Sequence, residues 1–341
     1  MKTGFVKILI SLPLLLGTTA VVNAQTDHSQ HAGHHQMTAE QLAELRSKIQ
    51  LYDQYSDEQI MVGMARMKNL WGWVGESPRN GRVGVLALAH GFKPEGNAQF
   101  TAAVGATATG QGYPTTYAFG MAMMSSDHIQ SAVSALEEAG AETIIVMPTT
   151  TADNSTLIRQ WDYIFGLEEK SAYLDVPRVK TGARLIWTDT PTAHPIMGEI
   201  MLDYARELSR DPANELVIIM GHGPQSAEDN DKELAILAGH ATYLAEEGGF
   251  ADVKFGNVQD DAPKSVRAAN AAMIRGWAQA ALDEGRDVVV VTTALTQSGV
   301  VARMERDVEG VARFNGRGLM QHPRFGDWID MQIETRVADA K

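Results

Sequence analysis

The sequence contains two apolar segments that end in the same His-Gly pair, one in each half of the chain. Residues 83–89 lead into His90 and a glycine, and residues 216–221 lead into His222 and a glycine. A continuous apolar, β-branched run is typical of a strand buried in a parallel sheet, and the glycine allows a sharp turn at its carboxyl end. Ligand sites of open α/β sheets lie at such ends, so both histidines are candidate functional residues.

The similarity between the two halves extends beyond these segments. A strand containing Phe-Gly, then a helix, then an apolar strand follow each His-Gly pair in the same order, and each half closes with a His-Pro pair, at His194 and His322. The His-Gly pairs lie 132 residues apart and the His-Pro pairs 128 apart, so one duplication accounts for both spacings. Because His194 and His322 each stand just before a predicted helix, we expect them to cap those helices.

Strand and helix patterns alternate through both halves of the chain. We predict strands at 83–89, 116–121, 143–147 and 183–188 and helices at 97–109, 126–139, 155–165 and 195–209, with the same order repeated from residue 216 to about 336. Such alternation predicts parallel sheets joined by right-handed crossovers. We therefore expect an α/β fold of two doubly wound parallel-sheet lobes, residues 82–212 and 213–341, related by a pseudo-twofold axis.

The first 24 residues have the pattern of a secretory signal. Lys2 and Lys7 precede an apolar stretch at 8–16, and small residues up to Ala24 fit a cleavage point. The stretch is short and is followed by no other run that approaches the roughly 20 apolar residues of a membrane span. We predict cleavage near Ala24 and a periplasmic or secreted protein without a membrane anchor.

Residues 25–37 form a polar leader that is rich in histidine and has no apolar pattern, so we expect it to be disordered. Neutral imidazoles bind Co, Ni, Cu and Zn well, and a flexible tract of this kind can hold metal weakly. The alternative is a solubilising leader whose histidines are incidental. The predicted metal-binding residues of the leader are His28, His31, His34 and His35.

A short helical segment is predicted at 38–81, between the leader and the repeated region. Thr38 and Ser56 begin capping-box patterns, and apolar residues recur behind them at helical spacing. Met64 and Met67 belong to that apolar stripe, and we interpret them as core packing rather than as a copper site.

The composition excludes several classes of site and partner. The chain has no cysteine, which rules out disulfides, thiolate metal sites and a lipid anchor on cysteine. The formal net charge of −13 becomes −15 once Lys2 and Lys7 leave with the signal, which disfavours nucleic acid and anionic membranes as partners. The sequence has no P-loop, no dinucleotide fingerprint after a strand, no Gly-x-Ser-x-Gly elbow and no His-Glu-x-x-His motif.

The order of the motifs resembles the class II chelatases, which insert cobalt, nickel or iron into sirohydrochlorin, and especially the two-repeat cobaltochelatases of the cobalamin pathway. The resemblance rests on the strand up to Gly91 with its polar loop, on residues 117–121, on the following helix and on the strand at 144–148, and it covers residues 82–337. It implies two α/β lobes with a cleft between them and no nucleotide. It also implies that His90, and through the repeat His222, bind metal and accept pyrrole protons.

The chain departs from the family pattern in one respect. Family members usually carry a second histidine soon after the proline-containing strand, and residues 148–156 have none, nor does the equivalent stretch 292–303. Metal insertion must remove two protons while an ion is held, so a second group beside the imidazole is expected. The candidates remain Glu95, Asp153 or His128 in the first lobe and Glu228, Asp229 or Glu305 in the second.

The loop after His90 offers both kinds of charge that this reaction needs. Glu95 supplies a carboxylate for metal, Lys93 a cation for the carboxylates of a tetrapyrrole, and Arg159 is a second candidate cation. We predict a protein that binds a divalent metal (Co, Ni or Fe) and inserts it into sirohydrochlorin or a related tetrapyrrole, with His90 more important than His222. The alternative is a non-catalytic periplasmic binder of metal or tetrapyrrole on the same scaffold. A purely structural protein would require the repeated His-Gly ends to be accidental.

Overall fold

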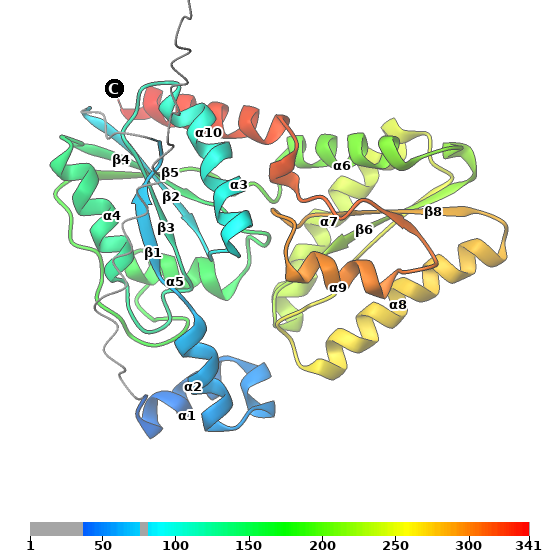
Figure 1. Cartoon of the computed structure of the whole chain (residues 1–341), viewed down its shortest axis with the longest axis horizontal. Coiled ribbons are helices and arrows are strands. Elements are labelled where there is room, and N and C mark those ends of the chain that lie inside the picture. Colours follow the sequence, from blue (N-terminus) through cyan, green and yellow to red (C-terminus); the bar gives the residue numbers. More distant parts are fainter. Residues whose placement is uncertain (1–36, 76–80, 341) are drawn as a thin grey trace, which may run out of the picture.

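The computed structural model describes residues 37–75 and 81–340, and Figure 1 shows the course of the chain. The predicted signal and the four leader histidines (His28, His31, His34 and His35) lie outside the described residues. No helix among the described residues is long and apolar enough to span a membrane.

The first lobe is built on a five-stranded sheet in the order β1-β3-β2-β4-β5. The four predicted strands are present and run parallel: β2 (Val83–Ala89), β3 (Thr115–Phe119), β4 (Thr143–Pro148) and β5 (Arg184–Trp187). A fifth strand, β1 (Leu70–Trp73), pairs antiparallel with β3 at the sheet edge. It lies in the segment 38–81, for which only helices were predicted, so this strand was not expected.

The second lobe has a four-stranded, wholly parallel sheet in the order β7-β6-β8-β9. Its strands are β6 (Glu215–Gly221), β7 (Asp252–Asn257), β8 (Asp287–Thr292) and β9 (Arg313–Phe314). Apart from the edge strand β1, which has no counterpart in the second sheet, the two orders match, with β2 equivalent to β6 and β3 to β7. The prediction of two equivalent doubly wound lobes is therefore confirmed, and the strands that end at His90 and His222 hold the same place in their sheets.

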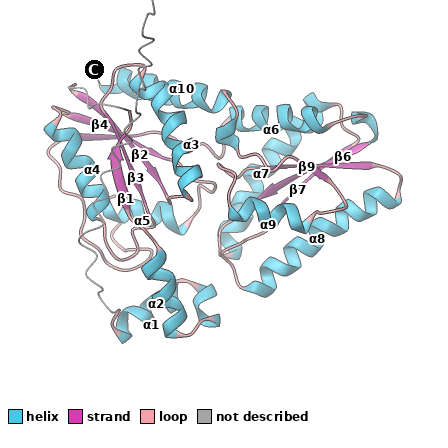
Figure 2. Ribbon diagram, viewed as in Figure 1, coloured by secondary structure: helices cyan, strands magenta, loops and turns pink. Residues whose placement is uncertain are grey.

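Helices cover both faces of each sheet, as Figure 2 shows. In the first lobe α4 (Asp127–Glu138) and α5 (Thr156–Ile164) pack on one face, where they meet Leu86 and Leu88 of β2. The intervening residues Val85 and Ala87 face α3 (Pro94–Val104), which continues into the π-helical turn η3 (Gly105–Thr109). Because alternate residues of β2 are buried on opposite faces of the sheet, the whole strand is apolar in sequence. Burial of each leucine-sized side chain contributes about 1.5–3 kcal/mol to stability.

The second lobe repeats this layering. Leu216, Ile218 and Met220 of β6 pack with α8 (Lys264–Asp283) and α9 (Gly299–Asp307) on one face. The long helix α7 (Ala227–Gly248) lies on the other face. Short 3₁₀ turns complete the chain at η4 (Pro212–Asn214) and η5 (Leu319–Gln321).

The closing helices of the two halves are exchanged between the lobes. Helix α6 (Pro195–Leu208) ends the first half of the sequence but packs on α7 and β8 of the second lobe, whereas α10 (Arg324–Ala340) ends the chain and packs on α3, β2 and β4 of the first (Figure 1). The Nδ1 atoms of His194 and His322 accept hydrogen bonds from backbone N–H groups two residues on, at 3.2 and 3.3 Å. Both histidines therefore cap these helices, as predicted.

The N-terminal segment consists of α1 (Ala39–Lys48), the 3₁₀ turn η2 (Gln50–Gln54) and α2 (Asp57–Arg66). Both predicted capping boxes are present, at Thr38 and Ser56. The segment packs on Met123 and Tyr173 of the first lobe through a small core to which Met64 belongs. Met67 is exposed instead, because the helix ends before it, so its assignment to the core was wrong.

Candidate inter-lobe site

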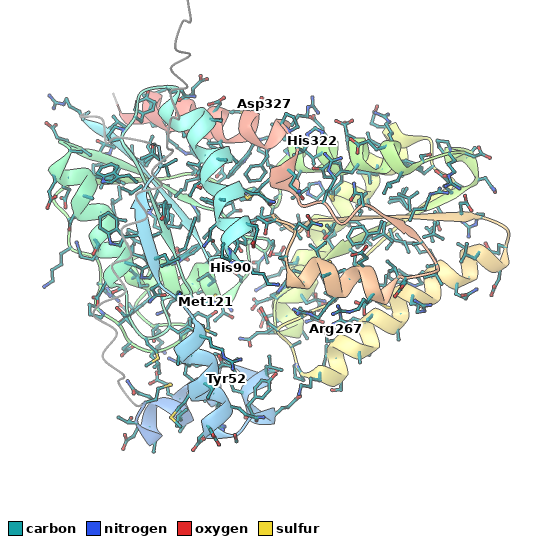
Figure 3. All side chains as sticks on the ribbon, in the orientation of Figure 1. Tyr52, His90, Met121, Arg267, His322 and Asp327 are labelled. Atoms are coloured by element: carbon teal, nitrogen blue, oxygen red, sulfur yellow. The ribbon has the colours of Figure 1, made fainter. Side chains whose placement is uncertain are left out.

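His90 lies at the carboxyl end of β2, on the side of the first lobe that faces the second (Figure 3). The next residue, Gly91, has a φ of +85°, a left-handed conformation that favours glycine and turns the chain away from the sheet. The ring of His90 packs against Phe92, with 4.6 Å between the two centroids. Strand and turn together therefore fix the ring at the sheet edge that faces the other lobe.

The surroundings of His90 keep its imidazole neutral. Desolvation lowers the pKa of His90 below its usual value, the nearby ring of His222 lowers it further, and the charge of Asp261 opposes both effects. The side chain is nevertheless accessible to solvent, so the desolvation comes from protein that surrounds the ring without covering it. A neutral, accessible imidazole has a lone pair with which to bind metal or accept a proton.

His222 occupies the equivalent position at the end of β6, before Gly223 with its φ of +72°. Its Nδ1 lies 2.8 Å from the carbonyl oxygen of Gly223, and because a carbonyl only accepts, Nδ1 carries the proton. The lone pair of the neutral ring is then on Nε2, which lies 3.7 Å from Oδ2 of Asp261. Histidines that bind metal commonly have this arrangement, with the second nitrogen bonded to a backbone carbonyl. His90 likewise bonds the backbone of Gly91.

Asp261 was not predicted from the sequence. It follows β7 in the second lobe and is two-thirds exposed, at 67% of its side-chain surface. Its charge raises the pKa of His90 in the first lobe. It also raises the pKa values of Tyr52 and Tyr173, for which burial is the larger cause. Asp261 therefore lies where both lobes and the N-terminal segment meet. The signal that could have found it is the acidic pair at 260–261, in a loop whose counterpart in the first half, 120–126, has no charged residue.

The other predicted site residues lie in different surroundings. Lys93 is the N-cap of α3 and Glu95 lies in its first turn, both exposed; the carboxylate that raises the pKa of His90 is Asp261. His128 is buried in α4, where burial lowers its pKa to about 3 and neither ring nitrogen has a hydrogen-bond partner among the described residues. Glu305 is exposed on α9.

The stretch that lacks the second family histidine joins the two lobes. The backbone N–H and side-chain amide of Asn154 donate to Glu233 on α7, at 2.8 and 3.0 Å. Asp153, one of the candidate groups, accepts a short hydrogen bond from Thr190. This stretch therefore serves lobe contacts, and the second histidine near His90 comes from the other lobe.

A cavity of about 330 Å³ lies where the N-terminal segment, α5 and the start of α7 meet. Its two cations are already engaged: Lys48 donates to Ser171 at 3.1 Å, and Arg159 binds Asp229 at 2.9 Å. Glu228 pairs with Lys232 at 3.0 Å on the outside of α7. Of the predicted groups, Asp229 and Arg159 thus neutralise each other.

Across residues 37–75 and 81–340, no three His, Asp or Glu side chains gather closely enough to hold a metal ion together. His90, His222 and Asp261 form a looser arrangement, two imidazoles from different lobes with one carboxylate beside them. An open set of this kind suits an ion that is held briefly and passed on, rather than one that stays as a structural metal.

No protein-family model matches the chain, and no curated protein matches its sequence. Among solved structures it is similar to SirB from Bacillus subtilis with Fe³⁺, at a TM-score of 0.57 and 14% identity over 76% of this chain and 97% of that one. It is also similar to the sirohydrochlorin chelatase SirB from Bacillus subtilis subspecies spizizenii in complex with cobalt, at a TM-score of 0.51 and 12% identity over 74% of this chain and 94% of that one. At sequence identities this low, the similarity shows a shared fold and nothing beyond it. The chain therefore has a chelatase-like fold, as its motif order predicted.

Proposed function

We propose that the protein is an exported chelatase that takes a divalent metal ion, Co, Ni or Fe, as substrate between His90 and His222 and inserts it into sirohydrochlorin or a related tetrapyrrole. One observation carries the proposal: His222 of the second lobe lies close enough to the equivalent His90 to lower the pKa of His90, and Asp261 lies 3.7 Å from His222. The fold shared with SirB, which is described with Fe³⁺ and with cobalt, supports it. Export rests on the signal pattern of residues 1–24.

The chemistry follows from the protonation states of the two rings. Two pyrrole N–H protons must leave as the ion enters the tetrapyrrole, and each imidazole accepts one on the nitrogen that has released the ion. The lowered pKa of His90 keeps it ready to accept, and the bonded Nδ1 of His222 leaves Nε2 for the same role. Asp261 then offsets the positive charge that develops on the rings.

Lys93 and Glu95 keep secondary roles in this proposal. Lys93 is exposed at the start of α3, close in sequence to His90, where a cation can bind the carboxylates of a tetrapyrrole. Glu95 lies two residues further, in the first turn of α3, and can accept the metal on its way to the histidines. The leader histidines (His28, His31, His34 and His35) would collect metal before it reaches this site.

A second candidate function is a non-catalytic carrier of metal or tetrapyrrole. The loose geometry favours it, since the described residues include no closed three-ligand set and the second family histidine is replaced by lobe contacts. Such a carrier would use the same two histidines to bind without releasing a metallated product.

The experiment that separates these functions follows the absorption spectrum of sirohydrochlorin mixed with Co²⁺ or Ni²⁺ and the purified mature protein. We use a leader variant in which His28, His31, His34 and His35 are replaced by glutamine, so that only the inter-lobe site binds metal. Turnover above the spontaneous rate, lost in His90→Ala, supports the chelatase. A stoichiometric spectral shift without turnover supports the carrier, and an unchanged spectrum contradicts both.

A further inference from the structure

The loop that follows β7 carries two neighbouring aspartates with opposite surroundings. The side chain of Asp261 is 67% exposed and reaches toward His222, whereas that of Asp260 is 8% exposed and pairs with arginines. An isolated buried carboxylate is costly, and a paired one strongly resists displacement. Asp260 therefore anchors the loop, and the side chain of Asp261 extends from the anchored loop toward His222.

Two arginines from different helices hold Asp260. Arg303 of α9 binds both carboxylate oxygens, with Nε 3.1 Å from Oδ1 and a shorter bond from Nη2 to Oδ2. Arg267 of α8 donates its Nε to the same Oδ1 at 3.4 Å. The remaining nitrogens of Arg267 bind both oxygens of Asp307 on α9, at 2.8 and 2.5 Å. The network thus joins the loop to both α8 and α9, and Figure 3 shows Arg267 on the part of the second lobe that lies toward the first.

The backbone of the loop is strained and held in that state. Gln259 has a φ of +51°, a left-handed conformation that costs a residue with a side chain of order 1 kcal/mol or more. Its buried amide donates to the carbonyls of Pro224 at 3.0 Å and Ser226 at 3.4 Å and accepts from Asn270 at 3.0 Å. Next to it, the N–H of Asp260 lies 3.4 Å from the carbonyl oxygen of His222. The loop of Asp261 and the loop of His222 are therefore bonded to each other directly.

The first lobe shows that the fold itself does not require this network. The equivalent loop, after β3, also has a left-handed residue, Ala122 with a φ of +49°. It carries no charged side chain, and its Met123 packs against the N-terminal segment instead. A left-handed residue thus follows the equivalent strand in both lobes. In the first lobe the loop packs on the N-terminal segment, and in the second it carries Asp261.

We propose that Arg303, Arg267 and Gln259 are positioning residues that hold Asp261 beside His222, so that a carboxylate of the second lobe accompanies a divalent cation at the inter-lobe site. This inference rests on the proposed function, because it assigns the network a role toward the metal substrate. The three residues act through Asp260 and the loop backbone and do not touch the ion.

The test uses the leader variant of the mature protein and Co²⁺ as the probe. Arg303→Lys retains the charge but cannot bind both oxygens of Asp260. Arg306→Lys, at an exposed arginine of the same helix, is the matched control. We expect Arg303→Lys to weaken Co²⁺ binding about tenfold, as loss of an outer-shell partner does, and to change the visible Co²⁺ spectrum. In an Asp261→Asn background the same change should have almost no further effect, since the carboxylate to be positioned is gone.

Gln259→Gly provides a second variant, which removes the bonds of the amide while allowing the left-handed backbone, and it should give the same loss. Equal losses from Arg303→Lys with and without Asp261 would overturn the proposal, because they would show a purely structural role. A metal-free crystal structure of Arg303→Lys decides the same question independently: the distance between His222 Nε2 and Asp261 Oδ2 should exceed the present 3.7 Å, and an unchanged distance contradicts the inference. Absence of any Co²⁺ binding that depends on His90 and His222 would instead refute the proposed function, while the crystal structure would still test the positioning.

Discussion

The guanidinium of Arg159 in the first lobe binds both carboxylate oxygens of Asp229 in the second, at 2.9 and 3.3 Å. Together with the bonds between Asn154 and Glu233, this ion pair joins the lobes on the side of α7. These contacts therefore fix the lobe that carries His90 to the lobe that carries His222.

We expect Arg159→Gln to lower the free energy of unfolding by about 1 kcal/mol, because the nearly buried Asp229 loses its shortest ion pair but keeps Ser226 and Lys232, and Arg159 is partly exposed. Urea denaturation would measure this change. Arg82→Gln breaks the exposed pair with Glu142, far from Asp229, and serves as the control, with an expected change near zero. Equal small changes in both variants would show that the Arg159 pair does not stabilise the lobe contact.

The two site histidines should act as one unit. The sequence ranked His90 above His222, but the proximity by which His222 lowers the pKa of His90 supports a shared site. In the leader variant we therefore expect His90→Ala and His222→Ala to weaken Co²⁺ binding by similar factors, each greater than the roughly 10- to 100-fold cost of losing an outer-shell partner. The double variant should lose little more than either single one, as measured by calorimetric titration. A much larger loss at one histidine would indicate two separate sites.

The leader and the inter-lobe site should be separable. Deleting residues 25–36 should reduce the number of Co²⁺ ions bound, counted by equilibrium dialysis, without altering the fold or the inter-lobe site. The deletion must stop before Met37, which is only 8% exposed and packs in the core of the N-terminal segment. An unfolded product, or one without inter-lobe binding, would show that the leader belongs to the site itself.

His128 should make stability depend on pH. Burial lowers its folded pKa to about 3, well below the unfolded value of 6.5, so the unfolded chain takes up the proton first as pH falls. The contribution of this group to stability is therefore complete above about pH 6.5 and falls by at most about 1.4 kcal/mol per pH unit between 6.5 and 3. His128→Leu should remove this dependence, so the difference in unfolding free energy between the two proteins should shift in favour of the variant from pH 7 to pH 4.5. A difference that stays constant with pH would mean that the buried ring is protonated or reaches water.

The sequence predicted the elements whose signal is local and missed what depends on contacts between distant segments. Residues 83–89 could be assigned to a buried strand because a parallel strand covered on both faces is continuously apolar. β1 has only four half-buried residues, two of them tryptophan and one glycine, and such a run shows no alternation. Asp261 has no motif of its own, and its role becomes visible only when the lobes bring it beside His222.

The exchange of α6 and α10 between the lobes could not be predicted from the sequence for a related reason. Because the halves are duplicated, each closing helix has an apolar face that could pack on either sheet, and the sequence pattern does not choose between them. The structure places α10 on the first lobe, and its Trp328 is fully buried there among residues of one continuous core. Trp328→Ala should therefore lower the free energy of unfolding by about 3–5 kcal/mol through the cavity it leaves. Hydrogen exchange would locate the effect: amides of β2 and β4 should lose more protection than those of β6 and β8, although Trp328 belongs to the second half of the chain. Greater loss in β6 and β8 would contradict the exchanged arrangement, because it would place α10 on its own half.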